Sequence, residues 1–148
     1  MHENETMMRS GYAAFAAGDI PAVLALFDPQ ITWTAPGNNS LAGVYTGHDA
    51  VVGFFTKLFE ITGGTFALKL ERMISNDNGV VAIVQASGER DGKSYSWGYA
   101  HVWEVKDHKA TSFTEYTDDG QAQDALFAGL TAGNAGVGKI VSTAETLA

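Results

Sequence analysis

The chain has 148 residues, of which 45% are hydrophobic and none is cysteine. This composition predicts one domain with a full apolar core and excludes disulfides, thiol catalysis and thiolate metal sites. The formal net charge is −8 with no run of Lys or Arg, so neither nucleic acid nor an anionic membrane is an expected partner, because both require a basic face. No apolar run reaches the length of about 18 residues that spans a membrane, and the first ten residues lack the pattern of a secretory signal. A cytoplasmic location is the default expectation and is not deduced from these observations.

The first half of the chain has the periodicity of helices interrupted by one strand. Apolar residues from Met8 to Phe15 recur at helical spacing until Gly18 ends the pattern. Asp19 is placed to cap a second, shorter helix. Helices are therefore expected over residues 3–17, 20–27 and 48–62, a strand over 30–35 and a loop over 36–47.

The second half has the alternation of strands separated by turn signals such as Asn78-Gly79. Strands are expected over residues 65–75, 80–89, 94–105 and 110–117, and a short helix over 120–130. Helices followed by a meander of strands predict an α+β fold, with one curved antiparallel sheet and helices packed on one of its faces.

No linker divides the sequence, so one domain is expected over residues 1–148, with its core at about 5–128. Residues 131–148 have few large apolar side chains and weak periodicity. This tail is expected either to be mobile or to cover a partner subunit or the mouth of a pocket.

Three stretches in order resemble one known group of proteins: YAAFAAGDIPAVLALFDPQITW, AGVYTGHDAVVGFF and AHVWEVKDHKATSFTEYTDD. The chain resembles the SnoaL-like polyketide cyclases and ketosteroid isomerases of the nuclear-transport-factor-2-like superfamily over residues 5–128. The resemblance implies a cone-shaped, cystatin-like fold with three to four helices, a pocket for a small hydrophobic ligand, and a homodimer with sheets packed back to back. A homodimer also suits residues 80–84, which are apolar on both faces of their strand.

The resemblance also implies which residues are catalytic. The cyclases carry an acid/base carboxylate, usually Asp, at the position of Glu115, and a histidine at the position of His101. The tyrosine of the isomerases is matched approximately by Tyr12. The base of the steroid isomerases falls at Ala35, and this departure counts against a ketosteroid isomerase.

The sequence leaves open whether His101 and Glu115 share a face of the sheet. A three-residue loop or a bulge in the hairpin between them places both side chains on one face, whereas a strict two-residue turn places them on opposite faces. A paired carboxyl and imidazole in an apolar wall is the usual material of acid–base catalysis near neutral pH.

Aromatic side chains clustered along the chain are candidates to line a pocket for a planar ligand. Asn38, in a loop, could hold a carbonyl group of the substrate. The four histidines show no paired ligand spacing and the glycines form no phosphate loop, so neither a metal nor a nucleotide cofactor is expected. The predicted substrate-binding residues are Tyr12, Trp33, Asn38, Tyr45, Phe55, Tyr99 and Trp103.

The leading hypothesis is a cofactor-independent acid/base enzyme, a cyclase, isomerase or dehydratase, acting on a small hydrophobic carbonyl compound such as a polyketide. One alternative is an epoxide hydrolase of the same fold, although no Arg lies in residues 80–88, where those hydrolases carry one. The other alternative is a noncatalytic module for ligand binding or dimerisation.

Overall fold

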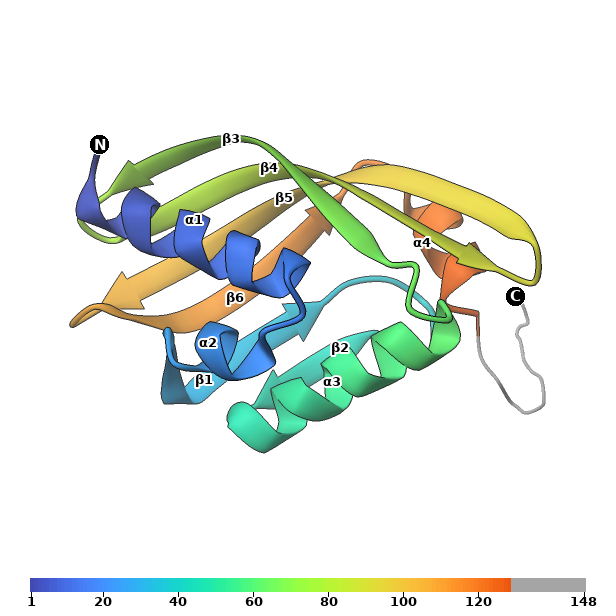
Figure 1. Ribbon diagram of the computed structural model, residues 1–148, viewed down its shortest axis with the longest axis horizontal. Helices are drawn as coiled ribbons and strands as arrows, with labels where there is room; N and C mark the ends of the chain where they lie inside the picture. The colour runs from blue at the N-terminus through green and yellow to red at the C-terminus, as the bar shows by residue number, and fades with distance from the viewer. Residues whose placement is uncertain (129–148) are drawn as a thin grey trace.

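The computed structural model describes residues 1–128 of the chain (Figure 1). The helices in this part are α1 (Glu3–Ala16), α2 (Ile20–Leu24), α3 (His48–Ile61) and α4 (Gly120–Leu126). The strands are β1 (Phe27–Ala35), β2 (Gly43–Thr46), β3 (Ala67–Asn76), β4 (Gly79–Arg90), β5 (Lys93–Lys106) and β6 (Lys109–Thr117). None of the helices described has the length and hydrophobicity needed to cross a bilayer. The tail expected at residues 131–148 lies outside the described residues.

The six strands form one sheet in the order β2-β1-β6-β5-β4-β3. Neighbouring strands are antiparallel except β1 and β6, which run parallel. The predicted α+β class with one curved sheet is confirmed, while this parallel pair differs from the fully antiparallel sheet that a meander predicts. The physical reason is that β1 and β6 are far apart in the sequence, so no hairpin turn sets their relative direction.

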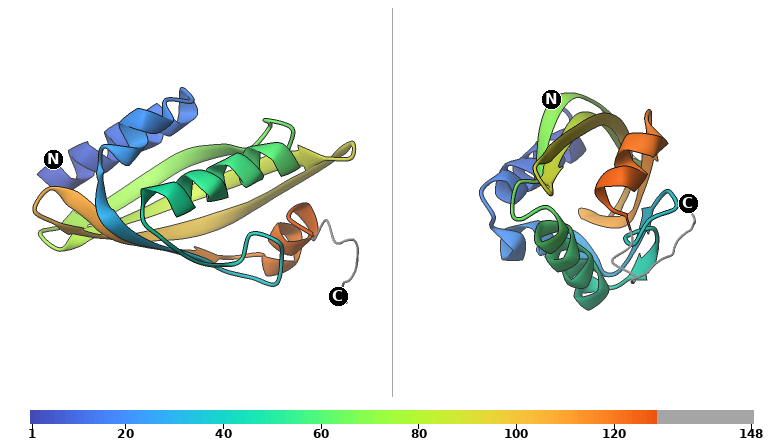
Figure 2. Two further views of the ribbon diagram at one scale, coloured as in Figure 1. Left: turned by 90° about the horizontal axis from the view of Figure 1, so that it is seen from below. Right: turned by 90° about the vertical axis from the view of Figure 1, so that its right-hand side faces the viewer.

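The sheet is strongly curved, and the helices lie along its concave side (Figure 2). The interior that they enclose is apolar. Shifts of register interrupt the pairing of β1 with β6, of β3 with β4 and of β5 with β6, and irregularities of this kind bend strands and increase their twist. Helix α1 packs on β3 and β4, α3 packs on β1 and β2, and α4 packs on β4 and β5. Burial alternates along β4 and β5, so every second side chain of these strands points into the interior.

Two local features differ from the prediction. Strand β1 begins at Phe27 and contains Pro29, which the sequence places before the strand. Its pairing with β6 is interrupted between Phe27 and Thr32, and such an interruption tolerates a proline because no ladder hydrogen bond is required of it. Strand β2 falls in the predicted loop, because a four-residue edge strand with mostly exposed side chains has no apolar alternation to reveal it.

The hairpin between β5 and β6 decides which face Glu115 occupies. A two-residue turn, with positive φ at Asp107 (52°) and His108 (63°), joins the strands. The pairing then shifts by one residue, and beyond this bulge His101 lies opposite Glu115, where an unshifted ladder would place Thr114. Of the arrangements that the sequence leaves open, the structure has the bulge, and both side chains are buried on the inner face.

The convex face of the sheet carries an apolar surface at its middle. One row of neighbouring residues crosses all six strands: Ile74, Val81, Val102, Thr114, Thr34 and Val44. Ile74 and Val44 are 58% and 66% exposed, and Tyr116, in the adjacent row, is 61% exposed. The other four residues of the row are half-buried. Exposed large apolar side chains gathered on one face of a sheet are typical of an interface.

We propose that this outer-face row forms the interface of a homodimer. The double variant Ile74→Glu with Tyr116→Glu would place carboxylates in the interface, and it should sediment as the 15.7 kDa monomer while the wild type sediments as a dimer. Thr56→Glu, at an exposed position of α3, is the control and should leave the dimer intact. A wild-type chain that remains monomeric at tens of micromolar would show that the face is not an interface.

Candidate active site

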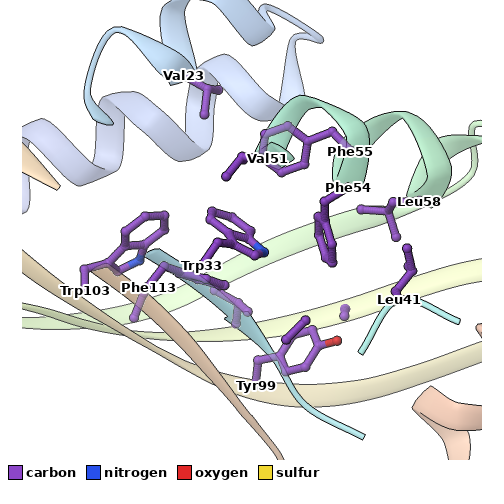
Figure 3. Packing of buried hydrophobic residues seen from close by; sticks show 14 of the residues in the cluster. Val23, Trp33, Leu41, Val51, Phe54, Phe55, Leu58, Tyr99, Trp103 and Phe113 are labelled. Atoms are coloured by element: carbon purple, nitrogen blue, oxygen red, sulfur yellow. The ribbon is translucent and has the colours of Figure 1, made fainter. Parts of the chain in front are cut away.

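A cavity lies between the concave face of the sheet and helices α1 and α3, and its walls are almost entirely apolar. The empty space between its atoms is about 580 Å³ when the opening to solvent is included. The part of this space that is wide enough for a water molecule is much smaller, about 50 Å³. Aromatic rings crowd around it (Figure 3). They include Phe15, Trp33, Phe55, Trp103, Phe113 and Phe127.

The mouth of the cavity lies between α1 and the start of β3. Phe15, Phe66 and Leu68 line the cavity and are only half-buried, in contrast to the side chains deeper in it. Phe15 and Phe66 meet edge to face with their ring centroids 6.5 Å apart. Phe66 follows Gly63 and Gly64, whose φ angles of 59° and 78° end α3 and turn the chain toward the mouth.

His101 of β5 and Glu115 of β6 lie side by side in the wall of the cavity. Their exposed fractions are 2% and 8%, and His101 Nε2 lies 3.2 Å from Glu115 Oε2. The histidine N–H bond does not point at this oxygen, so the contact is a close approach rather than a well-formed hydrogen bond. The carboxylate therefore keeps hydrogen-bonding capacity for a ligand.

Tyr12 of α1 connects His101 to Trp103. The Trp103 indole Nε1, which can only donate, donates a hydrogen bond of 3.0 Å to the Tyr12 hydroxyl oxygen. The same hydroxyl lies 2.6 Å from His101 Nδ1. The Tyr12 O–H proton then has His101 Nδ1 as its acceptor. The neutral imidazole therefore carries its own proton on Nε2, the nitrogen nearer Glu115. Tyr12 thereby fixes the tautomer and orientation of His101.

The two tyrosines of the cavity remain neutral phenols. Burial raises the pKa of Tyr12 far above its ordinary value, against a lowering by the Trp103 hydrogen bond, and the negative charge of Glu115 raises it further. Burial likewise raises the pKa of Tyr99, and Glu115 adds to the effect. Tyr99 donates a hydrogen bond of 2.6 Å to Gln123 Oε1, and Gln123 in turn donates to the carbonyl oxygen of Pro36. Both hydroxyls are therefore already committed to protein partners.

Most of the residues predicted for the site converge on the cavity. Besides His101 and Glu115, these are Tyr12, Trp33, Phe55, Tyr99 and Trp103. Tyr45 and Asn38 do not line it. Tyr45 packs on Phe54 and donates to the carbonyl oxygen of Leu41, while Asn38 is exposed and its backbone N–H donates to Asp124. The structure does not bring these two residues to the cavity, because β2 and the loop before it lie at the edge of the sheet.

Sequence reasoning missed Gln123, which is 1% exposed and fixes Tyr99. Its only signal is a polar residue on the inner side of a short helix, and α4 carries too few turns to make that side visible. It also missed Phe66 and Phe127, which both line the cavity and whose ring centroids lie 6.2 Å apart. Their pairing depends on segments 61 residues apart in the chain, so no local pattern could reveal it.

The chemistry of the site is limited by its charges. Apart from His101 and Glu115, the described residues that line the cavity carry no formal charge, and no Lys or Arg is among them. Within residues 1–128, no three His, Asp or Glu side chains come together as a metal site would require. The arrangement offers one carboxylate and one imidazole N–H to a ligand that is otherwise held by apolar contacts.

The raised tyrosine pKa values predict an alkaline loss of stability. The unfolded chain releases the phenolic protons near pH 10, whereas the folded chain retains them. The contribution of these groups to the free energy of unfolding is therefore fully present below about pH 10, and it falls above it by about 1.4 kcal/mol per pH unit for each group. Urea unfolding between pH 8 and pH 11 should therefore show a shallower decline for Tyr12→Phe than for the wild type. Tyr95→Phe, which removes a phenol outside the cavity, is the control, and equal slopes for all three proteins would contradict the prediction.

Comparison with known proteins identifies relatives of this fold. A SnoaL-like domain matches residues 8–113 of the chain. An uncharacterised protein of Mycobacterium tuberculosis is 31% identical over 123 residues, which cover 82% of this chain and 94% of the relative. The structure of Bal32a, from a soil-derived mobile gene cassette, has a TM-score of 0.80 at 33% identity, covering 84% of this chain and 95% of that one. An NTF2-like protein of Burkholderia pseudomallei has a TM-score of 0.76 at 25% identity, covering 87% and 100% of the two chains.

The family model covers well over half of the chain, and these structures share the curved sheet and its helices. The resemblance carried by the three sequence stretches is thus confirmed. The chain belongs to the SnoaL-like family of the NTF2-like superfamily.

Proposed function

We propose that the protein is a cofactor-independent acid/base enzyme that acts on a small, neutral, hydrophobic carbonyl compound, such as a polyketide. The observation that carries this proposal is the buried pair of Glu115 and His101, which faces an otherwise apolar cavity. A carboxylate held beside an imidazole and away from bulk water is suited to moving a proton from carbon.

In the proposed reaction, the Glu115 carboxylate takes a proton from the carbon next to the substrate carbonyl. The C–H bonding pair moves to form the enolate, and Glu115 becomes the neutral acid. Return of this proton to another carbon gives isomerisation. Attack of the enolate carbon on a second carbonyl forms a C–C bond and an alkoxide, which takes the proton from Glu115 and completes an aldol cyclisation. Expulsion of a hydroxyl from the β carbon, protonated by Glu115 as its C–O bond breaks, gives a dehydration with water as the product.

His101 acts on Glu115 rather than on the substrate carbon. Its Nε2 lies 3.2 Å from the carboxylate oxygen Oε2, and Tyr12 holds the imidazole in the tautomer that carries its proton on this nitrogen. Tyr12 and Trp103 are therefore positioning residues, because they reach the carboxylate only through His101.

The absence of Lys and Arg among the lining residues described supports a neutral substrate. A carboxylate or phosphate group on the ligand would be buried without a cationic partner and close to Glu115, which is unfavourable. The same observation gives no support to the epoxide hydrolase of this fold, whose arginine has no counterpart in this wall.

A noncatalytic binding module is the competing candidate, and the crowding of the cavity favours it. The centre of a water molecule reaches only about 50 Å³, so a bicyclic ligand requires the half-buried side chains at the mouth to move. The two candidates differ in whether a bound ketone exchanges protons with Glu115.

Exchange of α-protons tests the role of Glu115 without knowledge of the natural substrate. We expect the wild type to accelerate deuterium incorporation into 2-tetralone in D₂O, followed by proton NMR, and Glu115→Gln to lose at least about a hundredfold of this rate, since general bases contribute about 10²–10⁴-fold. Glu104→Gln, an exposed residue of β5, is the matched control and should retain the full rate. A wild type that binds 2-tetralone without exchange would favour the binding module.

His101→Ala and Tyr12→Phe should reduce the exchange rate less than Glu115→Gln, because both residues act through the carboxylate. Tyr12→Phe keeps the ring and removes only the hydroxyl, so its effect isolates the hydrogen bond to His101. Thermal unfolding measured on the same samples separates chemistry from structure, since losing one partner of a buried hydrogen bond costs about 1–3 kcal/mol of stability. If activity merely follows the folded fraction in both variants, the pair is structural.

A further inference from the structure

The indole N–H of Trp33 is a buried donor that has no hydrogen-bond partner among the described residues. Trp33 is 5% exposed, projects from β1 and lines the same cavity as Glu115. Figure 3 shows its nitrogen on the side of the ring that faces Phe54, away from Trp103. Buried donors in folded proteins are usually paired, so an unpaired one in a cavity wall calls for a partner that comes from outside.

Several of the side chains that pack on the Trp33 ring are aromatic and offer no strong acceptor to its N–H. Trp33 stacks on Phe113 with ring centroids 3.8 Å apart, and Phe54 and Phe55 lie at 5.5 Å and 5.4 Å. An N–H facing a ring gains only a weak interaction. Trp103, in the same cavity, is different, because its N–H donates to the Tyr12 hydroxyl. Of the two tryptophans that line the cavity, Trp33 is the one whose indole N–H has no hydrogen-bond partner among residues 1–128.

The position of Trp33 relative to Glu115 suits one small ligand. Trp33 pairs with Phe113 across β1 and β6, and Glu115 follows Phe113 by two residues on the same inner face. Two residues of a strand span roughly 7 Å, so a group bound at the indole and a C–H bond at the carboxylate can belong to the same molecule.

We propose that Trp33 Nε1 donates a hydrogen bond to the carbonyl oxygen of the substrate, so that the site selects neutral ketones over hydrocarbons of the same shape. The inference rests on the proposed function and identifies the group that orients its substrate. When Glu115 takes the α-proton, the electron pair of the broken C–H bond moves onto this oxygen. The indole N–H then faces the developing negative charge, and a preorganised donor at that point lowers the barrier.

Indole NMR provides a test that does not depend on turnover. The chain has three tryptophans, so ¹⁵N-labelled protein should give three indole signals, which single Trp→Phe variants assign. We expect 2-tetralone to move the Trp33 indole proton downfield, and tetralin, which has the same aromatic ring without the carbonyl, not to do so. Trp97 does not line the cavity and Trp103 is already bonded, so both serve as internal controls.

Affinity provides the second measurement. Trp33→Phe keeps an aromatic ring and removes the donor, and it should weaken 2-tetralone binding about fivefold to tenfold while leaving tetralin binding nearly unchanged. Trp97→Phe is the matched control and should alter neither. The proposal is overturned if tetralin moves the Trp33 signal as 2-tetralone does, if Trp33→Phe binds 2-tetralone normally, or if 2-tetralone does not bind.

The Glu115→Gln protein separates this inference from the proposed function. It should still bind 2-tetralone with the downfield shift of Trp33, because the donor is intact. A shift without α-proton exchange in the wild type would leave the Trp33 site standing and refute the proposed acid/base activity. Exchange without the shift would support the activity and refute the role of Trp33.

Discussion

The register of β5 against β6 is the constraint on which the site depends. Side chains alternate between the two faces of a sheet, so a slip of one residue would turn Glu115 outward and bring Thr114 in. The bulge after the turn sets the register in which His101 faces Glu115. The parallel ladder to β1 then holds it, because Phe113 is paired with Trp33 and stacks on its ring at 3.8 Å.

A chain of polar atoms crosses an interior that is otherwise built of hydrocarbon and aromatic rings. It runs from the Trp103 indole through the Tyr12 hydroxyl to His101 and ends at the Glu115 carboxylate. Each hydrogen bond along it has one sensible direction, because it begins at a group that can only donate. Its free capacity lies at the Glu115 end. Trp33, on the neighbouring region of β1, is a separate buried donor that has no partner among residues 1–128. A buried donor left without a partner destabilises the fold, so its place in the cavity wall suits ligand binding better than packing alone.

Membership of the SnoaL-like family fixes the fold of this chain and leaves its chemistry to the residues of the cavity. The carboxylate here is Glu rather than the usual Asp, and the extra methylene carries it to within 3.2 Å of His101. Ala35, at the position that resembles the base of steroid isomerases, is buried and small. The proton transfer that we propose therefore falls to one carboxylate on β6, in an environment set by Tyr12 and His101.

The sequence by itself determined the α+β class, the limits of the long helices and strands, and seven of the eighteen residues that line the cavity, among them His101 and Glu115. These depend on local physics: apolar periodicity, the capping of α2 by Asp19, and turn residues between strands. Only the tertiary structure decided the parallel pairing of β1 with β6, the shared face of His101 and Glu115, and the exclusion of Tyr45 and Asn38 from the cavity. The parallel pairing and the positions of Tyr45 and Asn38 depend on which distant segments lie side by side. The shared face of His101 and Glu115 depends on a bulge of one residue, which reverses the face of every side chain beyond it and which the hairpin sequence left open.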